Sequence, residues 1–241
     1  MSKKFLRIDP HVHSSGISLC SQLDYKQIIS EKKKMGYDGI ILMNHCQKWY
    51  YPPEEHASFI ERLIAEYRAA AEYAQTQDFQ VWLGIEVTLH EPHYADWLLF
   101  GVTTGFLRHT PCLYTLTQKE LFEYCNRCGI LMVQAHAFRE GHSPCNPEYM
   151  HGIEINCNER DIGNIAKVEV FAAEHKLIVT CGVDYHQVSH DYLGGMFVGE
   201  DCRSSVDFVR EIKRNGKTRV FLQKEAKEYP IYQEKTAFLV K

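Results

Sequence analysis

Short apolar runs alternate with helical patterns along most of this 241-residue chain. The runs are rich in β-branched residues and predict strands. They cover residues 5–9, 38–44, 79–87, 97–102, 129–136, 152–156, 177–184 and 219–223. Strands that alternate with helices in this way are typical of an α/β domain with a parallel sheet.

Helical periodicity fills the segments between these runs, with apolar positions three and four residues apart. Helices are predicted over residues 25–36, 54–77, 117–129, 164–176 and 204–216. Gly36, Gly129 and Gly216 stand where glycine usually follows a helix. Thr117, with Glu120 three residues later, forms a capping-box pattern.

The alternation predicts a single domain over residues 1–241, because no Gly/Ser-rich or Pro-rich linker and no internal repeat interrupts it. The chemistry described below falls within residues 5–200. Residues 201–241 supply the last helix, the last strand and a tail, 228–241, that is apolar enough to pack against a protein surface.

Composition and charge exclude several classes of protein. Hydrophobic residues make up 45% and charged residues 24% of the chain, as in ordinary globular proteins. A net charge of −4 argues against a polymeric nucleic acid as partner. No secretory signal and no membrane-spanning run is found, and an odd number of cysteines, nine, suits a reducing compartment. We therefore expect a cytoplasmic protein.

Histidines and carboxylates gather at the C-terminal ends of the predicted strands. They are Asp9, His11, His13, His45, Glu86, His136, Glu154, Asp184 and His186. In a parallel α/β barrel these ends open on one face, where active sites are built. Imidazoles with a few carboxylates suit zinc, manganese or iron, and there are more of them than one ion needs. Two or three divalent ions are therefore expected on this face.

The other histidines are expected to be ordinary core or surface residues, which is the default for a histidine. They are His56, His90, His109, His142, His151 and His175. His93 and His190 are considered separately below.

The order of the motifs resembles the polymerase and histidinol phosphatase (PHP) family of phosphoesterases. Residues 8–15 resemble its Asp-x-His-x-His opening and residues 36–45 its second motif. Residues 84–87, 135–139 and 182–186 resemble its later Glu-, His- and Asp-x-His-containing segments. The resemblance implies an α/β fold, a distorted seven-stranded (β/α)7 TIM-like barrel, with a trinuclear metal centre.

The resemblance also implies which residues bind each ion. One ion would be held by His11, His13, Glu86 and Asp184. Glu86 would bridge to a second ion, which His136 also binds. His45 and His186 would hold the third.

The sequence departs from the family pattern at three places. The family usually has a histidine before the fourth strand, where this chain has Asp96, with His93 three residues earlier as the alternative ligand. After His13 the family has a further Asp or His, which Ser18 or Cys20 would replace here. Asn44 stands where the family usually has an Asp. The last two departures affect the third ion.

Such a centre lowers the pKa of a bound water from about 15.7 towards 7. The expected reaction is hydrolysis of a small phosphomonoester by a hydroxide that bridges two ions, with Asp184 and His186 at the catalytic centre. Arg139 matches a phosphate oxygen with its planar fork, or else forms a salt bridge at the rim. His190, Asn156 and Asn158 are expected either to contact the substrate or to support the metal ligands through hydrogen bonds.

Two other interpretations remain open. An amidohydrolase-type carbon–nitrogen or ester hydrolase also opens with His-x-His on a barrel. That class generally uses a lysine on the fourth strand, and predicted strands three to five contain none. The other interpretation is a metal-binding regulatory domain without turnover. The late Asp-x-His motif favours the phosphoesterase and a small phosphorylated substrate.

Overall fold

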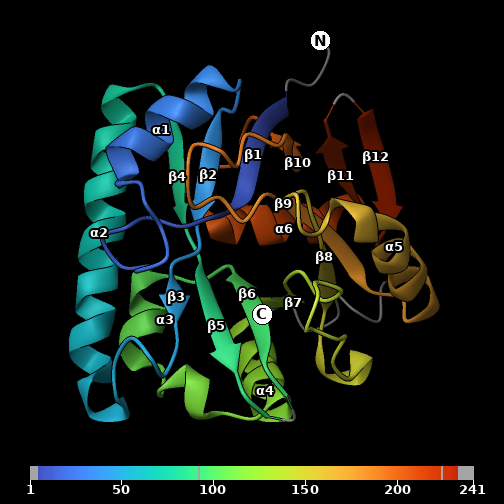
Figure 1. The fold of residues 1–241 in the computed structure, drawn as a ribbon, viewed down its shortest axis with the longest axis horizontal. Helices are drawn as coiled ribbons and strands as arrows, with labels where there is room; N and C mark the ends of the chain where they lie inside the picture. Colours follow the sequence, from blue (N-terminus) through green and yellow to red (C-terminus); the bar gives the residue numbers. More distant parts are fainter. Residues whose placement is uncertain (1–4, 92, 224, 233–241) are drawn as a thin grey trace.

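The computed structural model describes residues 5–91, 93–223 and 225–232, which form a mixed α/β fold with two six-stranded sheets (Figure 1). The first sheet contains, in spatial order, β12 (Glu225–Pro230), β11 (Lys217–Leu222), β10 (Gly194–Gly199), β1 (Phe5–Val12), β2 (Gly39–Leu42) and β4 (Gln80–Leu83). The second contains β3 (His45–Cys46), β5 (Ile85–Leu89), β6 (Ala95–Phe100), β7 (Leu131–Gln134), β8 (Gly152–Asn156) and β9 (Ile178–Gly182).

The strand count differs from the expected seven, since twelve strands are assigned in the described residues. The apolar run 79–87 is divided between β4 in the first sheet and β5 in the second. Gly84 lies at the break, where a Cβ atom would approach Met43 Sδ to 2.3 Å. The predicted run 38–44 contains β2, and the short strand β3 follows it at His45. Strands β10 and β12 had no counterpart among the predicted strands.

The expected parallel sheet is also only partly correct. Strands β1, β2 and β4 are parallel, as are β7, β8 and β9. However, β6 is antiparallel to both β5 and β7, and β10 is antiparallel to both β1 and β11. The sheets are therefore mixed.

The two sheets are joined by backbone hydrogen bonds near the C-terminal ends of β1 and β2. His13 N donates to Tyr185 O at 3.0 Å, and Tyr185 N donates to His11 O at 3.1 Å. On the other side of the first sheet, Gly84 N donates to Leu42 O at 3.0 Å. The polar segments that follow β1, β2 and β9 consequently meet in one region.

Helices cover the sheets. They are α1 (Tyr25–Lys34), α2 (His56–Thr76), α3 (Thr104–His109), α4 (Gln118–Cys128), α5 (Ile165–Glu174) and α6 (Ser205–Asn215). Short 3-10 helices occur at Pro53–Glu55, Leu113–Thr115, Pro147–Tyr149 and Ile162–Asn164. The five predicted helices are confirmed with slightly shorter ends, and α3 is additional. The capping box of α4 is confirmed, and Gly129 ends it at φ 69°.

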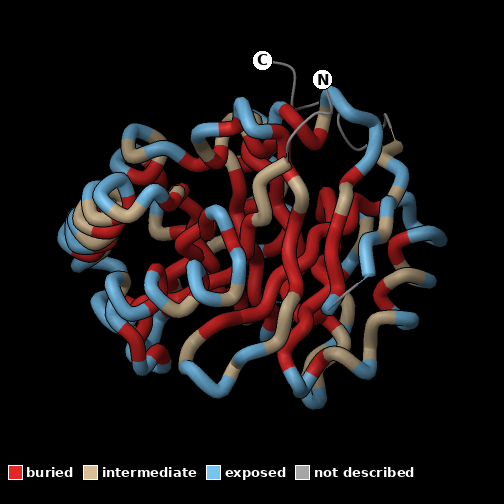
Figure 2. The backbone as a smooth tube through the Cα atoms, turned by 90° about the horizontal axis from the view of Figure 1, so that it is seen from above, coloured by how far each residue is buried: buried red, intermediate tan, exposed pale blue. Residues whose placement is uncertain are grey.

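The core lies along the central strands, which are almost continuously buried (Figure 2). Helices α1 and α2 cover β2 and β4 at one flank, and α5 packs on β8 and β9 (Figure 1). Of the predicted tail, Ile231 packs against the core, while residues 233–241 lie outside the described residues. Among the described helices, none has the length and apolar character needed to cross a lipid bilayer.

Candidate metal centre

The eight side chains expected to bind metal lie together where strands of both sheets end. Four groups of three residues each bring one ligand atom per residue within 4.8 Å of the others. The groups are His13–His45–His186, His11–Glu86–His136, His11–His13–Asp184 and Asp96–His136–His142. Because His11, His13 and His136 each belong to two groups, the groups form one continuous centre and not separate sites.

Glu86 lies in the middle of this centre and is fully buried. Its Oε1 is 3.4 Å from His11 Nε2 and 3.5 Å from His136 Nε2. Its Oε2 is 3.4 Å from His13 Nε2 and 2.8 Å from His45 Nδ1. One carboxylate thus faces four imidazoles, two with each oxygen, which is an arrangement suited to bridging two cations.

Several buried polar atoms of the centre have no hydrogen-bond partner among the described residues. They are His11 Nε2, His13 Nε2, His45 Nδ1, His136 Nδ1 and both carboxylate oxygens of Glu86. Buried polar atoms are normally paired, so a convergent set of unpaired ones needs an explanation. Lone pairs on imidazole nitrogen and carboxylate oxygen fit a divalent ion such as zinc, manganese or iron.

A second layer of hydrogen bonds orients the histidines. His11 Nδ1 is 2.8 Å from Glu154 Oε1, the arrangement that commonly fixes a metal-binding imidazole. Asn156 Nδ2 donates to Glu154 Oε2 at 2.9 Å, so Asn156 lies beneath the centre and supports Glu154. Asn158, in contrast, lines the cavity described below.

Electrostatics keep the central carboxylates ionised. Burial opposes ionisation of Glu86, but His45 and His11 hold its pKa well below the usual range. Burial likewise opposes ionisation of Asp184, whose pKa is held well below the usual range by His186, His11 and Arg139. Burial, with His186 and His45, lowers the pKa of His13 well below its ordinary value and favours the neutral imidazole that binds metal.

The backbone is strained at two of these residues. His136 has φ 30° and Asp184 has φ 57°, a region that residues other than glycine rarely adopt. Such conformations persist only when the surrounding structure enforces them, and they cluster at functional sites. Here they follow β7 and β9 directly and turn both side chains towards the centre.

The structure brings Asp96, and not His93, to the centre. Asp96 Oδ2 lies 3.8 Å from His136 Nε2, while Oδ1 accepts a hydrogen bond of 2.6 Å from Thr88 Oγ1. His93 is turned away and lies 3.2 Å from Ser143 O. Because β6 is antiparallel to its neighbours, its N-terminal end lies beside the C-terminal ends of β5 and β7.

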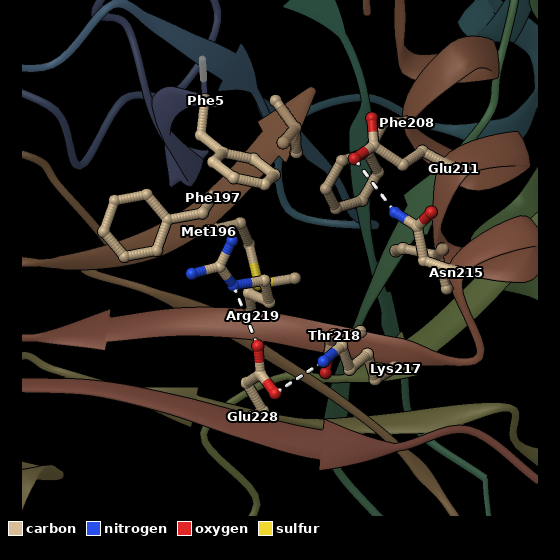
Figure 3. A pocket seen from close by; sticks show the side chains of 12 residues that line it. Phe5, Met196, Phe197, Phe208, Glu211, Asn215, Lys217, Thr218, Arg219 and Glu228 are labelled. Atoms are coloured by element: carbon tan, nitrogen blue, oxygen red, sulfur yellow. Dashed lines mark hydrogen bonds and ion pairs between the residues drawn. The ribbon is translucent and has the colours of Figure 1, made fainter. Parts of the chain in front are cut away.

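A polar cavity of about 460 Å³ opens over the centre. Six of the residues that line it are Asp96, His136, Arg139, Asp184, His186 and His190. A second cavity, of about 270 Å³, lies between α6 and strands β10 and β11, where Glu228 pairs with Lys217 and Arg219 (Figure 3). It includes none of the candidate metal ligands, so we place the chemistry in the first cavity.

Arg139 lines the first cavity and forms ion pairs with two carboxylates. Its Nε and Nη2 donate to Asp161 Oδ2 at 2.9 and 2.6 Å, and Nη2 also donates to Asp184 Oδ2 at 2.8 Å. Although burial lowers it, the pKa of Arg139 is raised by these carboxylates. Nη1 makes no hydrogen bond within the described chain and is free to bind an anion.

His190 is positioned by the loop after β9. Its Nδ1 accepts from His186 N at 3.3 Å, and Asp184 O lies 3.2 Å from the same nitrogen. The side chain also lines the cavity beside His186, where it can contact a ligand and support the loop.

The structure adds His142 and Cys20 to the residues around the centre. His142 was expected to be an ordinary residue, but it groups with Asp96 and His136. It lies in a turn, where His142 N donates to Arg139 O at 2.8 Å, so no strand end marked it. Cys20 Sγ lies 3.1 Å from His186 Nε2. Burial raises the pKa of this thiol, but hydrogen bonds with His186 and His45 prevail and lower it to about 6.

Ser18 and Asn44 have supporting positions. Ser18 Oγ lies 3.4 Å from His13 Nδ1, accepts from His45 N at 3.1 Å and donates to Asn44 Oδ1 at 3.0 Å. Asn44 Oδ1 also accepts from Ser14 N at 2.8 Å. These residues hold the loops that present His13 and His45.

No protein-family model matches the sequence, and no curated protein is similar enough to count as a relative. Solved structures do share the fold. A two-domain protein from Bacteroides vulgatus ATCC 8482, described as containing a predicted PHP-like metal-dependent phosphoesterase, superposes with a TM-score of 0.65 at 20% identity. The match covers 92% of this chain and 66% of that one, so this chain spans just under two thirds of that protein.

Two further structures are similar over most of their length. PsfC from Pseudomonas syringae PB-5123 has a TM-score of 0.62 at 15% identity, with coverage of 98% of this chain and 96% of that one. An amidohydrolase from Chromobacterium violaceum, determined with bound sulfate and no metal, has a TM-score of 0.53 at 13% identity, with coverage of 84% and 95%. At these identities the comparisons establish a shared fold.

Proposed function

We propose that this chain is a metal-dependent phosphoester hydrolase of the PHP type that acts on a small phosphomonoester. The observation that carries the proposal is the Glu86 carboxylate facing four imidazoles beneath a polar cavity that Arg139 lines. The description of the Bacteroides protein as containing a predicted PHP-like phosphoesterase supports the same class.

The arrangement of strands supports a distorted barrel of the TIM type. If β2 with β3, and β4 with β5, are each taken as one interrupted strand, the order β1, β2/β3, β4/β5, β6, β7, β8, β9 closes where Val12 pairs with Tyr185. A ring of this kind brings ligands that are distant in sequence to one mouth.

The proposed ligands are the eight residues His11, His13, His45, Glu86, Asp96, His136, Asp184 and His186. When bound, divalent ions supply Lewis acidity towards phosphate oxygens and a water of lowered pKa as nucleophile. Asp161 and Asp184 accept hydrogen bonds from Nε and Nη2 of Arg139, which leaves Nη1 to bind a non-bridging phosphate oxygen. Arg160 adds a second guanidinium at the cavity.

The alternative is hydrolysis of a carbon–nitrogen bond, which the likeness to the Chromobacterium amidohydrolase favours. The two guanidinium groups at the cavity argue for an anionic substrate instead, because arginine matches phosphate in charge and geometry. The phosphoester and amide activities are separable by direct assay.

The test is to purify the full chain, measure bound Mn, Fe and Zn, and assay 4-nitrophenyl phosphate, bis-4-nitrophenyl phosphate and a panel of amides. We expect bound metal and metal-dependent release from the monoester. The double variant His11→Ala/His13→Ala should lose metal and at least about 100-fold of the activity while keeping its circular dichroism spectrum. Absence of both bound metal and phosphate release from the wild-type protein would refute the proposal.

A further inference from the structure

Cys20 is placed at the edge of the metal centre, in the loop between β1 and α1. Its Sγ lies 3.1 Å from His186 Nε2 and accepts a hydrogen bond of 3.4 Å from Tyr50 OH. The residue is exposed and lines the cavity together with His45 and His186. A thiol in this position reaches both the centre and any ligand that enters.

The adjoining group His13–His45–His186 independently requires a ligand. The ring of His13 stacks on His45 at 4.4 Å and on His186 at 4.2 Å between centroids. His13 is fully buried, and its Nε2 has no hydrogen-bond partner within the described chain. Three imidazoles therefore face one another, one from the loop after β1, one from β3 and one from the loop after β9.

The serine hydroxyl of the same loop does not substitute for the thiol. Ser18 Oγ is already engaged with Asn44 Oδ1 and His45 N, and it lies on the Nδ1 side of His13. Cys20 Sγ instead contacts the Nε2 atom of His186. The loop thus presents sulfur, and not the serine oxygen, to this group.

We propose that Cys20 is the fourth protein ligand of the His13–His45–His186 group and that it increases the preference of this site for zinc over manganese. The inference rests on the proposed metal-dependent function and concerns one site of the centre. A thiolate with three imidazoles is a soft donor set, which suits zinc far better than manganese. Zinc–sulfur and zinc–nitrogen bonds of about 2.3 and 2.0 Å at a tetrahedral angle set S and N roughly 3.5 Å apart, so the observed 3.1 Å requires little movement.

Cobalt(II) provides a direct test because a cobalt–thiolate bond absorbs in the near ultraviolet, independently of turnover. We expect the full chain loaded with Co²⁺ to show this charge-transfer band, and Cys20→Ser to lose it while keeping the visible bands of bound cobalt. Cys128→Ser is the matched control and should keep both, since Cys128 is an exposed cysteine on α4 away from the cavity.

A competition between Zn²⁺ and Mn²⁺ tests the selectivity. Cys20→Asp keeps a ligand but replaces sulfur with oxygen, so the ratio of bound zinc to manganese should fall by about tenfold or more. A wild-type protein that binds cobalt without the charge-transfer band, or a band that survives in Cys20→Ser, would overturn this inference and leave the proposed function intact. A wild-type protein that binds no divalent ion would instead overturn the metal dependence on which both rest.

Discussion

Lys32 is fully buried, with its Nζ 2.6 Å from Asp9 Oδ2. Asp9 also accepts hydrogen bonds from His11 N and Val183 N, so this carboxylate ties β1 to the segment after β9. Burial raises the pKa of Asp9 and lowers that of Lys32, although each partner opposes the shift. The Asp9–Lys32 ion pair therefore holds β1 and the segment after β9 in place, although burying both charges costs desolvation free energy.

Lys32→Met should leave the charge of Asp9 buried without a counterion. We expect the free energy of unfolding to fall by about 3–5 kcal/mol, as when one partner of a buried ion pair is removed. Asp9→Asn/Lys32→Met should lose less than the single variant, because no charge is then buried. Urea unfolding of both variants and of the wild type measures these differences. Lys34→Met, on the exposed Lys34–Glu31 pair of the same helix, should change stability by less than about 0.5 kcal/mol.

Arg139→Lys separates substrate binding from metal binding. A lysine retains the charge but cannot hold Asp161 and Asp184 while also binding a phosphate oxygen. We expect kcat/KM for 4-nitrophenyl phosphate to fall by about 10- to 100-fold, the value of one charged hydrogen bond, with unchanged metal content. Arg108→Lys, in the exposed bidentate pair with Glu61, is the control and should leave kcat/KM unchanged. A loss of metal together with activity would contradict the assigned role.

The sequence predicted most of the centre because its residues follow strands. His136 and Asp184 come directly after apolar runs, and the ends of such runs meet in α/β folds. His142 could not be found in this way, since a turn and not a strand brings it to Asp96. The position of Cys20 depends on how the long loop after β1 folds, which residue spacing alone does not determine.

At the level of elements, helices were easier to predict than strands. Helical periodicity and the Thr117 cap fixed α4 closely, whereas apolar runs give no strand direction, so the antiparallel position of β6 was not predictable. Gly84, at the break between β4 and β5, has no room for a Cβ atom beside Met43, which its sequence neighbours do not reveal. Strand β12 is mostly polar and exposed, and its sequence therefore lacks the apolar signal of a strand.

Glu169 links α5 to β12, accepting hydrogen bonds of 2.7 Å from Tyr229 OH and 3.0 Å from Lys227 Nζ. Burial opposes the ionisation of Glu169, but these two partners lower its pKa below the ordinary value of 4.5. A carboxylate whose pKa is depressed by folding stabilises the protein above its ordinary pKa. This contribution is lost as the pH falls through the folded-state value.

Glu169→Gln should therefore destabilise the protein by about 1 kcal/mol at neutral pH, a value reduced by the partial exposure of the pair. The difference from wild type should shrink as the pH falls below about 4.5. Urea unfolding across this range checks both expectations. The exposed Glu174→Gln on the same helix should show neither effect, and a pH-independent difference for Glu169→Gln would contradict the assignment.

For the whole molecule, the candidate metal centre lies where the two sheets meet. His11 and His13 come from β1 of the first sheet and the loop after it. Glu86, His136 and Asp184 belong to β5 or follow β7 and β9 of the second sheet. A cation bound by these residues cross-links the sheets in the folded state, and the unfolded chain has no such preformed site.

Metal binding should consequently stabilise the entire fold and not only the loops of the centre. Zinc at about 100 times its Kd should add about 2.7 kcal/mol to the free energy of unfolding. We expect a higher urea midpoint with zinc and a lower one after chelation, with secondary and tertiary structure lost together. His11→Ala/His13→Ala should respond to neither treatment, because it removes ligands of the first sheet. If chelation moved the midpoint of this variant as far as that of the wild type, the stabilising ion would lie elsewhere in the molecule.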